Sequence, residues 1–170
     1  MNLFFRLFWI SIFSKFRSPT SVLGPCLTPF TCGPADLDVL RHMNNGRYFS
    51  ILDLARVDLL IRAGLADKIS KNGWYPVVVA ETMRFKKSIN LFESFFVETS
   101  VLGWDEKAFI LHQRFLRKND CVAEAVIRAR FLKKSGGSVD PLLIIELAGI
   151  NTAPSELPDW IQDWNRQQSV

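Results

Sequence analysis

The chain has 170 residues, of which 48% are hydrophobic and 22% charged, a composition that excludes a disordered protein and fits one globular domain. Its 21 basic residues only slightly outnumber the 17 acidic ones, a balance too even for a nucleic-acid binder that neutralises phosphates. The three cysteines are widely spaced without a C-x-x-C pair, so we expect reduced thiols in a cytoplasmic protein. Fourteen Phe and five Trp exceed what a small domain needs, unless some face a ligand, a partner or lipid.

Residues 1–17 are predicted to form a hydrophobic and basic helix. Arg6 interrupts the apolar run Leu3–Phe13, which at about 1.5 Å per residue covers about half of a bilayer's hydrocarbon thickness, so a transmembrane span is not expected. Arg6, Ser14 and Arg17 fall within about 80° of one another around such a helix. The favoured prediction is an interfacial helix that attaches the protein to the cytoplasmic face of a membrane. Packing on the domain or on a partner subunit, and a cleaved targeting segment, are the alternatives.

The rest of the chain divides by composition into three expected parts. These are a linker at residues 18–25, the domain at residues 26–150, and a tail at residues 151–170 with a short Trp-containing helix. Within the domain, the apolar spacing over Gly46–Gly64 predicts the longest helix. Asn44 or Asn45 is its natural N-cap, because an Asn side chain accepts from the unpaired N–H groups of a first turn, and Gly64 suits its C-terminal end.

Extended segments surround this helix in the sequence. They are Cys26–Cys32 before it and, after it, Val77–Lys86, Glu93–Gly103, Ala108–Arg117 and Cys121–Lys133. Turns at Trp104–Lys107 and Lys118–Asp120 are short enough for hairpins, so the last three strands should form an antiparallel meander. The final strand alternates small apolar and charged residues, and its row of alanines would let the helix lie close. The predicted fold class is α+β, a long central helix wrapped by an antiparallel sheet.

The segment with the most chemical character, Asp36–Tyr48, reads DLDVLRHMNNGRY and precedes and opens the long helix. The first turn of a helix presents unpaired N–H groups and a partial positive charge, which polarise a carbonyl oxygen and stabilise the oxyanion formed on attack. Asp38 can then act as a general base for water, or as a nucleophile, on a carbonyl directed at Asn45 and Gly46. Turn and capping chemistry explains the same residues without catalysis.

This segment resembles the D-x-D-x-x-x-H-[MV]-N-N-x-x-Y signature of hotdog-fold thioesterases of the 4-hydroxybenzoyl-CoA thioesterase-like group. The resemblance covers roughly residues 27–135, and Glu81–Lys87 is similar to the family's basic strand. It implies hydrolysis of a thioester of coenzyme A or acyl carrier protein, with Asp38 as the catalytic carboxylate and the carbonyl-polarising N–H at Asn45. Some subfamilies place His or an aromatic residue at this last position, so the nucleophile and general-base mechanisms both stay open. The resemblance also implies a homodimer or tetramer with each site between joined sheets.

The other candidate site residues each have a structural alternative. His42 either orients Asp38 and water or bonds to the loop backbone. Asn44 either caps the helix or contacts substrate, and Tyr48 either packs with a local hydroxyl bond or contacts substrate. Arg84 and Lys86 either bind the phosphates of coenzyme A or form a solvated strand face. No metal and no cofactor is expected, since two distant His and scattered Cys match no ligand spacing.

Two further features complete the prediction. Of the acids on the long helix, neither Asp53 nor Asp58 clearly matches the helix carboxylate of another branch of the family, and Asp53 is expected to face solvent or a subunit. Trp160 and Trp164 are four residues apart and should dock on the domain or its dimer partner.

We expect a thioesterase for medium- or long-chain fatty acyl-CoA. The alternative is a non-catalytic, membrane-associated acyl- or lipid-binding protein.

Overall fold

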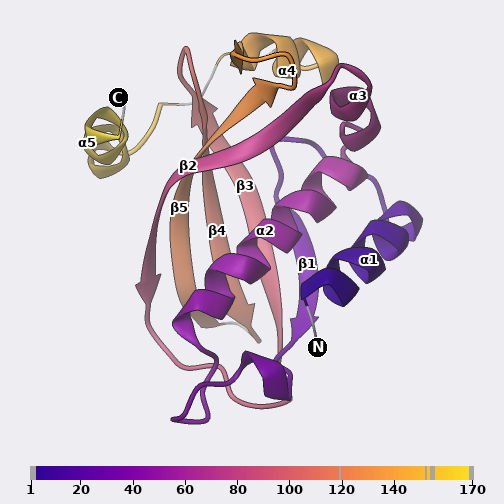
Figure 1. Cartoon of the computed structure of the whole chain (residues 1–170). Coiled ribbons are helices and arrows are strands. Elements are labelled where there is room, and N and C mark those ends of the chain that lie inside the picture. The colour runs from indigo at the N-terminus through magenta and orange to yellow at the C-terminus, as the bar shows by residue number, and fades with distance from the viewer. Residues whose placement is uncertain (1–2, 119, 152, 154–155, 169–170) are drawn as a thin grey trace.

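A computed structural model of the chain describes residues 3–118, 120–151, 153 and 156–168. An antiparallel sheet curls around the long helix α2 (Figure 1). The helices are α1 (Leu3–Phe13), α2 (Asn45–Arg62), α3 (Ala66–Lys71), α4 (Pro141–Leu147) and α5 (Asp159–Gln167), with 3₁₀ turns at Ser14–Phe16 and Pro34–Asp36. The strands are β1 (Cys26–Thr31), β2 (Trp74–Phe85), β3 (Ser94–Trp104), β4 (Phe109–Arg117), β5 (Asp120–Lys133) and β6 (Ser138–Val139).

The sheet has the order β1-β3-β4-β5-β2, and β6 pairs with β5. The predicted β3-β4-β5 meander is confirmed. β2 begins at Trp74 rather than at Val77, and it pairs with β5 so that Arg84 lies opposite Glu124. In the second predicted turn, Lys118–Asp120, the residue Asn119 lies outside the described residues. The α+β architecture is therefore as predicted, with β1 and β2 at the two edges of the sheet.

The core lies between α2 and the concave face of the sheet. Ile51, Leu52 and Ala55 of α2 are buried there, and so are Ala123 and Ala125 of β5. The small side chains on β5 leave room for the larger ones of the helix, as the alternation along this strand predicts. The long helix is thereby fixed against the sheet, and its N-terminal end takes a defined position at the edge of the domain (Figure 1).

Helix α1 forms as predicted, but its polar stripe faces inward. An interfacial helix would turn Arg6 and Ser14 to water, whereas here they are 6% and 3% exposed and bond to the buried carboxylates of Asp36 and Asp58. The aromatic side chains therefore point outward, and α1 packs beside α2 and β1 (Figure 1). No helix in the described ranges is long and apolar enough to cross a membrane.

Three short elements were not expected from the sequence: α3, β6 and α4. Helices of six or seven residues carry too little periodicity to be recognised. The signal for α4 was local, because the Asp140 side chain accepts from the Leu142 N–H at 2.9 Å and Pro141 occupies the first helical position. The Trp-containing helix α5 is present as predicted, but Ile161 is its buried anchor and Trp160 is 57% exposed.

Candidate active site

The loop before α2 is held closed by backbone hydrogen bonds. The Asp36 carbonyl accepts from the Asn44 N–H at 2.8 Å, and the Asp38 N–H donates to the His42 carbonyl at 2.9 Å. Arg41 has φ +62°, a left-handed conformation that lets the chain turn back between these contacts. The loop therefore presents its side chains from a fixed hairpin-like frame at the N-terminal end of the long helix.

The Asp38 carboxylate is half-buried, and one of its two oxygens accepts hydrogen bonds from the loop backbone. Its Oδ1 accepts from the N–H groups of Leu40 at 2.8 Å and His42 at 3.4 Å. Within the described part of the chain, its Oδ2 makes no hydrogen bond. Turn chemistry therefore uses one oxygen of Asp38 and fixes the carboxylate, and the second oxygen stays available to a ligand or to water.

The N-terminus of α2 offers one backbone donor beside this loop. Asn44 is the N-cap, as predicted, and its Oδ1 accepts from the Gly46 N–H at 2.9 Å. The Gly46 amide is thus committed to the cap. The N–H of Asn45, at the first helical position, has no acceptor within the helix, and Asn45 itself is exposed. Of the two predicted oxyanion donors, Asn45 is the one that the helix leaves free.

His42 and Tyr48 have different environments. His42 is half-buried and joins the loop through its backbone, including a bridge to Asn90. Tyr48 is only 2% exposed, and its ring contacts Phe85 and Phe115 with centroids 5.1 and 4.8 Å away. Burial raises the pKa of the Tyr48 hydroxyl. Tyr48 is therefore a core residue of the first turn, and it does not point into solvent beside Asp38.

Arg84 lies near the end of β2, on the face of the sheet away from α2, and Lys86 directly follows the strand; both are exposed. The Lys86 ammonium pairs with Glu124 at 2.9 Å. The Arg84 guanidinium makes no hydrogen bond or ion pair within the described residues. Both cations thus lie near Glu124, and the hydrogen bond from Lys86, helped by the charge of Arg84, lowers the pKa of that carboxyl. The assignment of Arg84 and Lys86 to coenzyme A phosphates stays a prediction.

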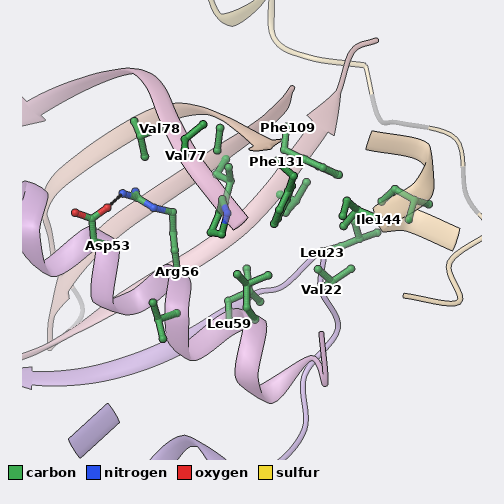
Figure 2. Close-up of a pocket in the computed structure, with 17 residues that line it drawn as sticks. Val22, Leu23, Asp53, Arg56, Leu59, Val77, Val78, Phe109, Phe131 and Ile144 are labelled. Atoms are coloured by element: carbon green, nitrogen blue, oxygen red, sulfur yellow. Dashed lines mark hydrogen bonds and ion pairs between the residues drawn. The ribbon is translucent and has the colours of Figure 1, made fainter. Parts of the chain in front are cut away.

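An apolar cavity of about 190 Å³ lies between α2 and the sheet. Figure 2 shows the Asp53–Arg56 pair near Val78 at one end, and Leu23 with Ile144 of α4 at the other. The lining between them is aliphatic and aromatic, from α2, β2, β4 and β5: Leu59, Leu60, Val77, Phe109, Leu111, Ala129 and Phe131. A narrow cavity of this composition suits a hydrocarbon chain.

The two acids of α2 face opposite ways. Asp53 has a 64% exposed side chain, as predicted, and pairs with Arg56, which also donates to Gln113 at 2.6 Å. Asp58 is completely buried on the side of α1 and β1, where the Ser14 and Thr28 hydroxyls each donate to it at 2.6 Å. Asp58 is saturated with donors and lies outside the cavity lining. It therefore has a structural role.

Sequence reasoning missed two features of this region. The first is the ion pair between Arg6 and Asp36, for which the signal was a single charge inside an apolar run, since Arg is rarely buried without a partner. The second is the cavity, whose far end depends on the unpredicted α4. The loop that carries Asp38 is separated from this cavity along α2. At about 1.5 Å per residue, Arg56 in the cavity lining lies about 16 Å beyond Asn45, the first residue of the helix.

Comparisons with known proteins identify a family and a shared fold. Residues 32–165 match the model of the Thioesterase-like superfamily. The protein THEM6 of Xenopus laevis is 40% identical over 97 residues, which are 57% of this chain and 47% of that protein. The probable thioesterase YbaW of Escherichia coli superposes with a TM-score of 0.66 at 22% identity, over 71% of this chain and 93% of that one. The BH1999 gentisyl-coenzyme A thioesterase superposes with a TM-score of 0.65 at 17% identity, over 71% and 99%.

A long helix wrapped by an antiparallel sheet, shared with the superposed structures, defines the hotdog fold. The chain belongs to the thioesterase-like superfamily, and the resemblance seen in the sequence is confirmed. It spans about half the length of the Xenopus relative.

Proposed function

We propose that the protein hydrolyses acyl-CoA thioesters with Asp38 as the catalytic carboxylate. The observation that carries this proposal is the Oδ2 of Asp38, which accepts no hydrogen bond from the described residues, in the loop that leads into α2 of a chain of the thioesterase-like superfamily. The coenzyme A carrier is supported by a structural neighbour, the BH1999 gentisyl-coenzyme A thioesterase. The test is release of free thiol from acyl-CoA, measured with the wild-type chain and with Asp38→Asn.

The reaction needs one base and one carbonyl-polarising donor. The thioester carbonyl oxygen accepts from the Asn45 N–H, where the helix dipole favours the developing negative charge. Asp38 either takes a proton from the water that attacks the carbonyl carbon, or attacks that carbon itself to give an anhydride that water then hydrolyses. The C–S bond breaks in both routes, and the products are the acid and coenzyme A. Both routes use the same carboxylate oxygen.

The acyl group is assigned to the cavity along α2. The aliphatic and aromatic lining beyond the Asp53–Arg56 pair disfavours a charged acyl group. The distance of about 16 Å from Asn45 to Arg56 along the helix requires a chain of medium or greater length to reach the cavity from the first turn. Ile144, at the far end, is 1% exposed. This placement favours fatty acyl over small aromatic substrates.

Changing Ile144 to Phe is expected to shorten the preferred acyl chain. The larger side chain occupies the far end of the cavity, so the ratio of kcat/KM for long over short acyl-CoA should fall by about tenfold, because excluding about two methylenes costs about 0.8 kcal/mol for each. The control is Leu143→Phe on the same helix, since Leu143 is 43% exposed and does not line the cavity. An unchanged chain-length profile in Ile144→Phe would contradict the assignment.

The partner proposed for each chain is a second copy joined through β2. The β1 edge is covered: Arg6 and Arg62 donate to the carbonyls of Thr31 and Leu27, and Pro29 has no N–H. The outer edge of β2 has no strand beside it in the described residues. Its exposed apolar residues are Tyr75, Val78, Val79 and Phe85. An open apolar edge of this kind pairs readily with another strand.

Placing a charge on this edge should separate the copies. Val79→Lys is expected to give a monomer in sedimentation velocity at concentrations where the wild type is a dimer or tetramer, because an edge lysine blocks strand pairing. Leu142→Lys is the control, since Leu142 is also exposed and belongs to α4 rather than to β2. A monomeric wild type, or a Val79→Lys protein that associates like the wild type, would refute the β2 interface.

The outer face of α1 is proposed to bind an anionic lipid surface. Phe5 and Phe8 are 62% and 58% exposed, and Phe16 is 84% exposed beside Lys15. Aromatic side chains next to basic ones partition into the interface of negatively charged bilayers. The helix is held to the domain by its other face, so this contact would be peripheral.

The wild-type chain is expected to sediment with vesicles that contain phosphatidylserine. The double variant Phe5→Ser/Phe8→Ser should sediment at least about tenfold less, because burying each phenyl ring is worth about 1.5–3 kcal/mol. Leu142→Ser, which also removes an exposed apolar side chain, should sediment like the wild type. Equal sedimentation of the Phe variant and the wild type would show that α1 does not bind lipid.

A further inference from the structure

Arg6 of α1 reaches the loop that carries Asp38. Its Nη2 lies 2.5 Å from Asp36 Oδ2 and donates to the Thr31 carbonyl at 3.1 Å. The side chains of Arg6 and Asp36 are 7% and 2% exposed. The Gly33 N–H donates to the same carboxylate oxygen at 2.8 Å. The pair is therefore buried, and it joins a helix outside the sheet to the start of the loop, while the more exposed Arg47 lies farther away, with its Nε 4.0 Å from Asp36 Oδ1.

Asp36 also closes the loop through its backbone. Its carbonyl accepts the Asn44 N–H at 2.8 Å, and the neighbouring residues Leu37 and Met43 form a β-bridge. Asp38 lies inside the segment that these contacts close, and Asn44 is the cap of α2. The position of Asp36 thus fixes both the catalytic carboxylate and the helix N-terminus relative to each other.

We propose that Arg6 is a positioning residue for Asp38 and acts through Asp36. This inference rests on the proposed function. A buried carboxylate that loses its nearest cation is left poorly compensated and draws in water, which loosens the bonds that hold it. The loop would then carry Asp38 in a range of positions. Because catalytic geometry tolerates little displacement, kcat falls while binding of the acyl chain in the distant cavity is kept.

The same segment provides a matched control. Arg17 also joins the N-terminal region to a buried carboxylate, with Nη1 lying 2.8 Å from Asp58 Oδ2. Asp58 belongs to α2 and does not line the cavity, and its hydrogen bonds and ion pairs among the described residues involve none of residues 36–44. Loss of Arg17 therefore weakens the attachment of this region without disturbing the position of Asp38.

The test compares Arg6→Met, Arg6→Lys and Arg17→Met without vesicles, at a temperature at which circular dichroism shows each to be folded. Arg6→Met should lower kcat by about tenfold or more with KM within about twofold, Arg6→Lys should restore part of kcat, and Arg17→Met should keep kcat within about twofold. Asp36→Asn combined with Arg6→Met should add little to the loss, as for residues that act as one unit. Equal loss of kcat in Arg6→Met and Arg17→Met would overturn the proposal.

Amide hydrogen exchange separates this proposal from the function on which it rests. In the protein without substrate, residues 36–44 should exchange faster in Arg6→Met than in the wild type, while they are unchanged in Arg17→Met. Unchanged exchange over residues 36–44 in Arg6→Met refutes the positioning role, whatever the activity. A wild type that is inactive but shows the expected exchange would refute the proposed function and leave the loop contact standing.

Discussion

Replacing Asp38 with Asn should lower kcat for acyl-CoA hydrolysis by about 10³-fold. An amide neither accepts the proton of the attacking water nor forms an acyl intermediate, so both proposed routes are lost. The Asn side chain still offers an oxygen to the N–H groups of Leu40 and His42, so the loop should keep its shape. Thiol release under saturating acyl-CoA measures the effect.

The control for this variant is Asp67→Asn, which removes an exposed carboxylate from the first turn of α3, remote from the loop. It should hydrolyse acyl-CoA like the wild type. Full activity in Asp38→Asn, with its thermal unfolding unchanged, would remove Asp38 from the catalytic machinery and leave it as a turn residue only.

The largest effect on stability is expected at Asp58. Asp58→Ala removes a fully buried carboxylate. The guanidinium groups of Arg17 and Arg62, which lie 2.8 and 3.5 Å from its Oδ2, then lose this counter-charge. Breaking a buried pair from one side costs about 3–5 kcal/mol, because the remaining charge is desolvated without compensation. Urea denaturation should show this as a lower midpoint with an unchanged slope.

Asp53→Ala on the same helix is the matched comparison. Its carboxylate pairs with Arg56 but is 64% exposed, and surface pairs contribute about 0–1 kcal/mol. The free energy of unfolding should therefore fall far less than in Asp58→Ala. Equal losses in the two variants would mean that the Asp58 cluster contributes no more than a surface pair does.

Local patterns were sufficient for most of the fold. The alternation along β5 and the spacing of apolar residues along α2 are repeated signals, and each agrees with the neighbouring turn residues. The cap at Asn44 was predictable for the same reason, because capping depends on residues within one turn. These features need no knowledge of distant parts of the chain.

The orientation of α1 was not predictable in this way. Its apolar residues lie nearly all around the helix, so the side that packs is chosen by the buried carboxylates of Asp36 and Asp58, which are 30 residues from Arg6 and 44 from Ser14. Burying Arg6 and Ser14 against these acids satisfies all four groups, and this outweighs exposing aromatic rings. The orientation of α1 therefore depends on tertiary contacts with residues far away in the sequence.

Burial also decided between the alternatives for Tyr48. A tyrosine in the first turn of a helix suits either a binding site or the core, and the sequence does not tell which side of α2 the sheet will cover. Contacts with Phe85 of β2 and Phe115 of β4 place it in the core. For the same reason the cavity beside Ile144 required the structure, because α4 closes it from far along the chain.

Release of free thiol by the wild-type chain from straight-chain acyl-CoAs of increasing length, with benzoyl-CoA as the aryl comparison, tests the central claim most directly. We predict turnover that rises from short to medium or long chains and exceeds that with benzoyl-CoA. No release from any of these thioesters by folded protein would contradict the claim, and fatty acid or phospholipid retained by that protein would then identify a non-catalytic acyl-binding protein.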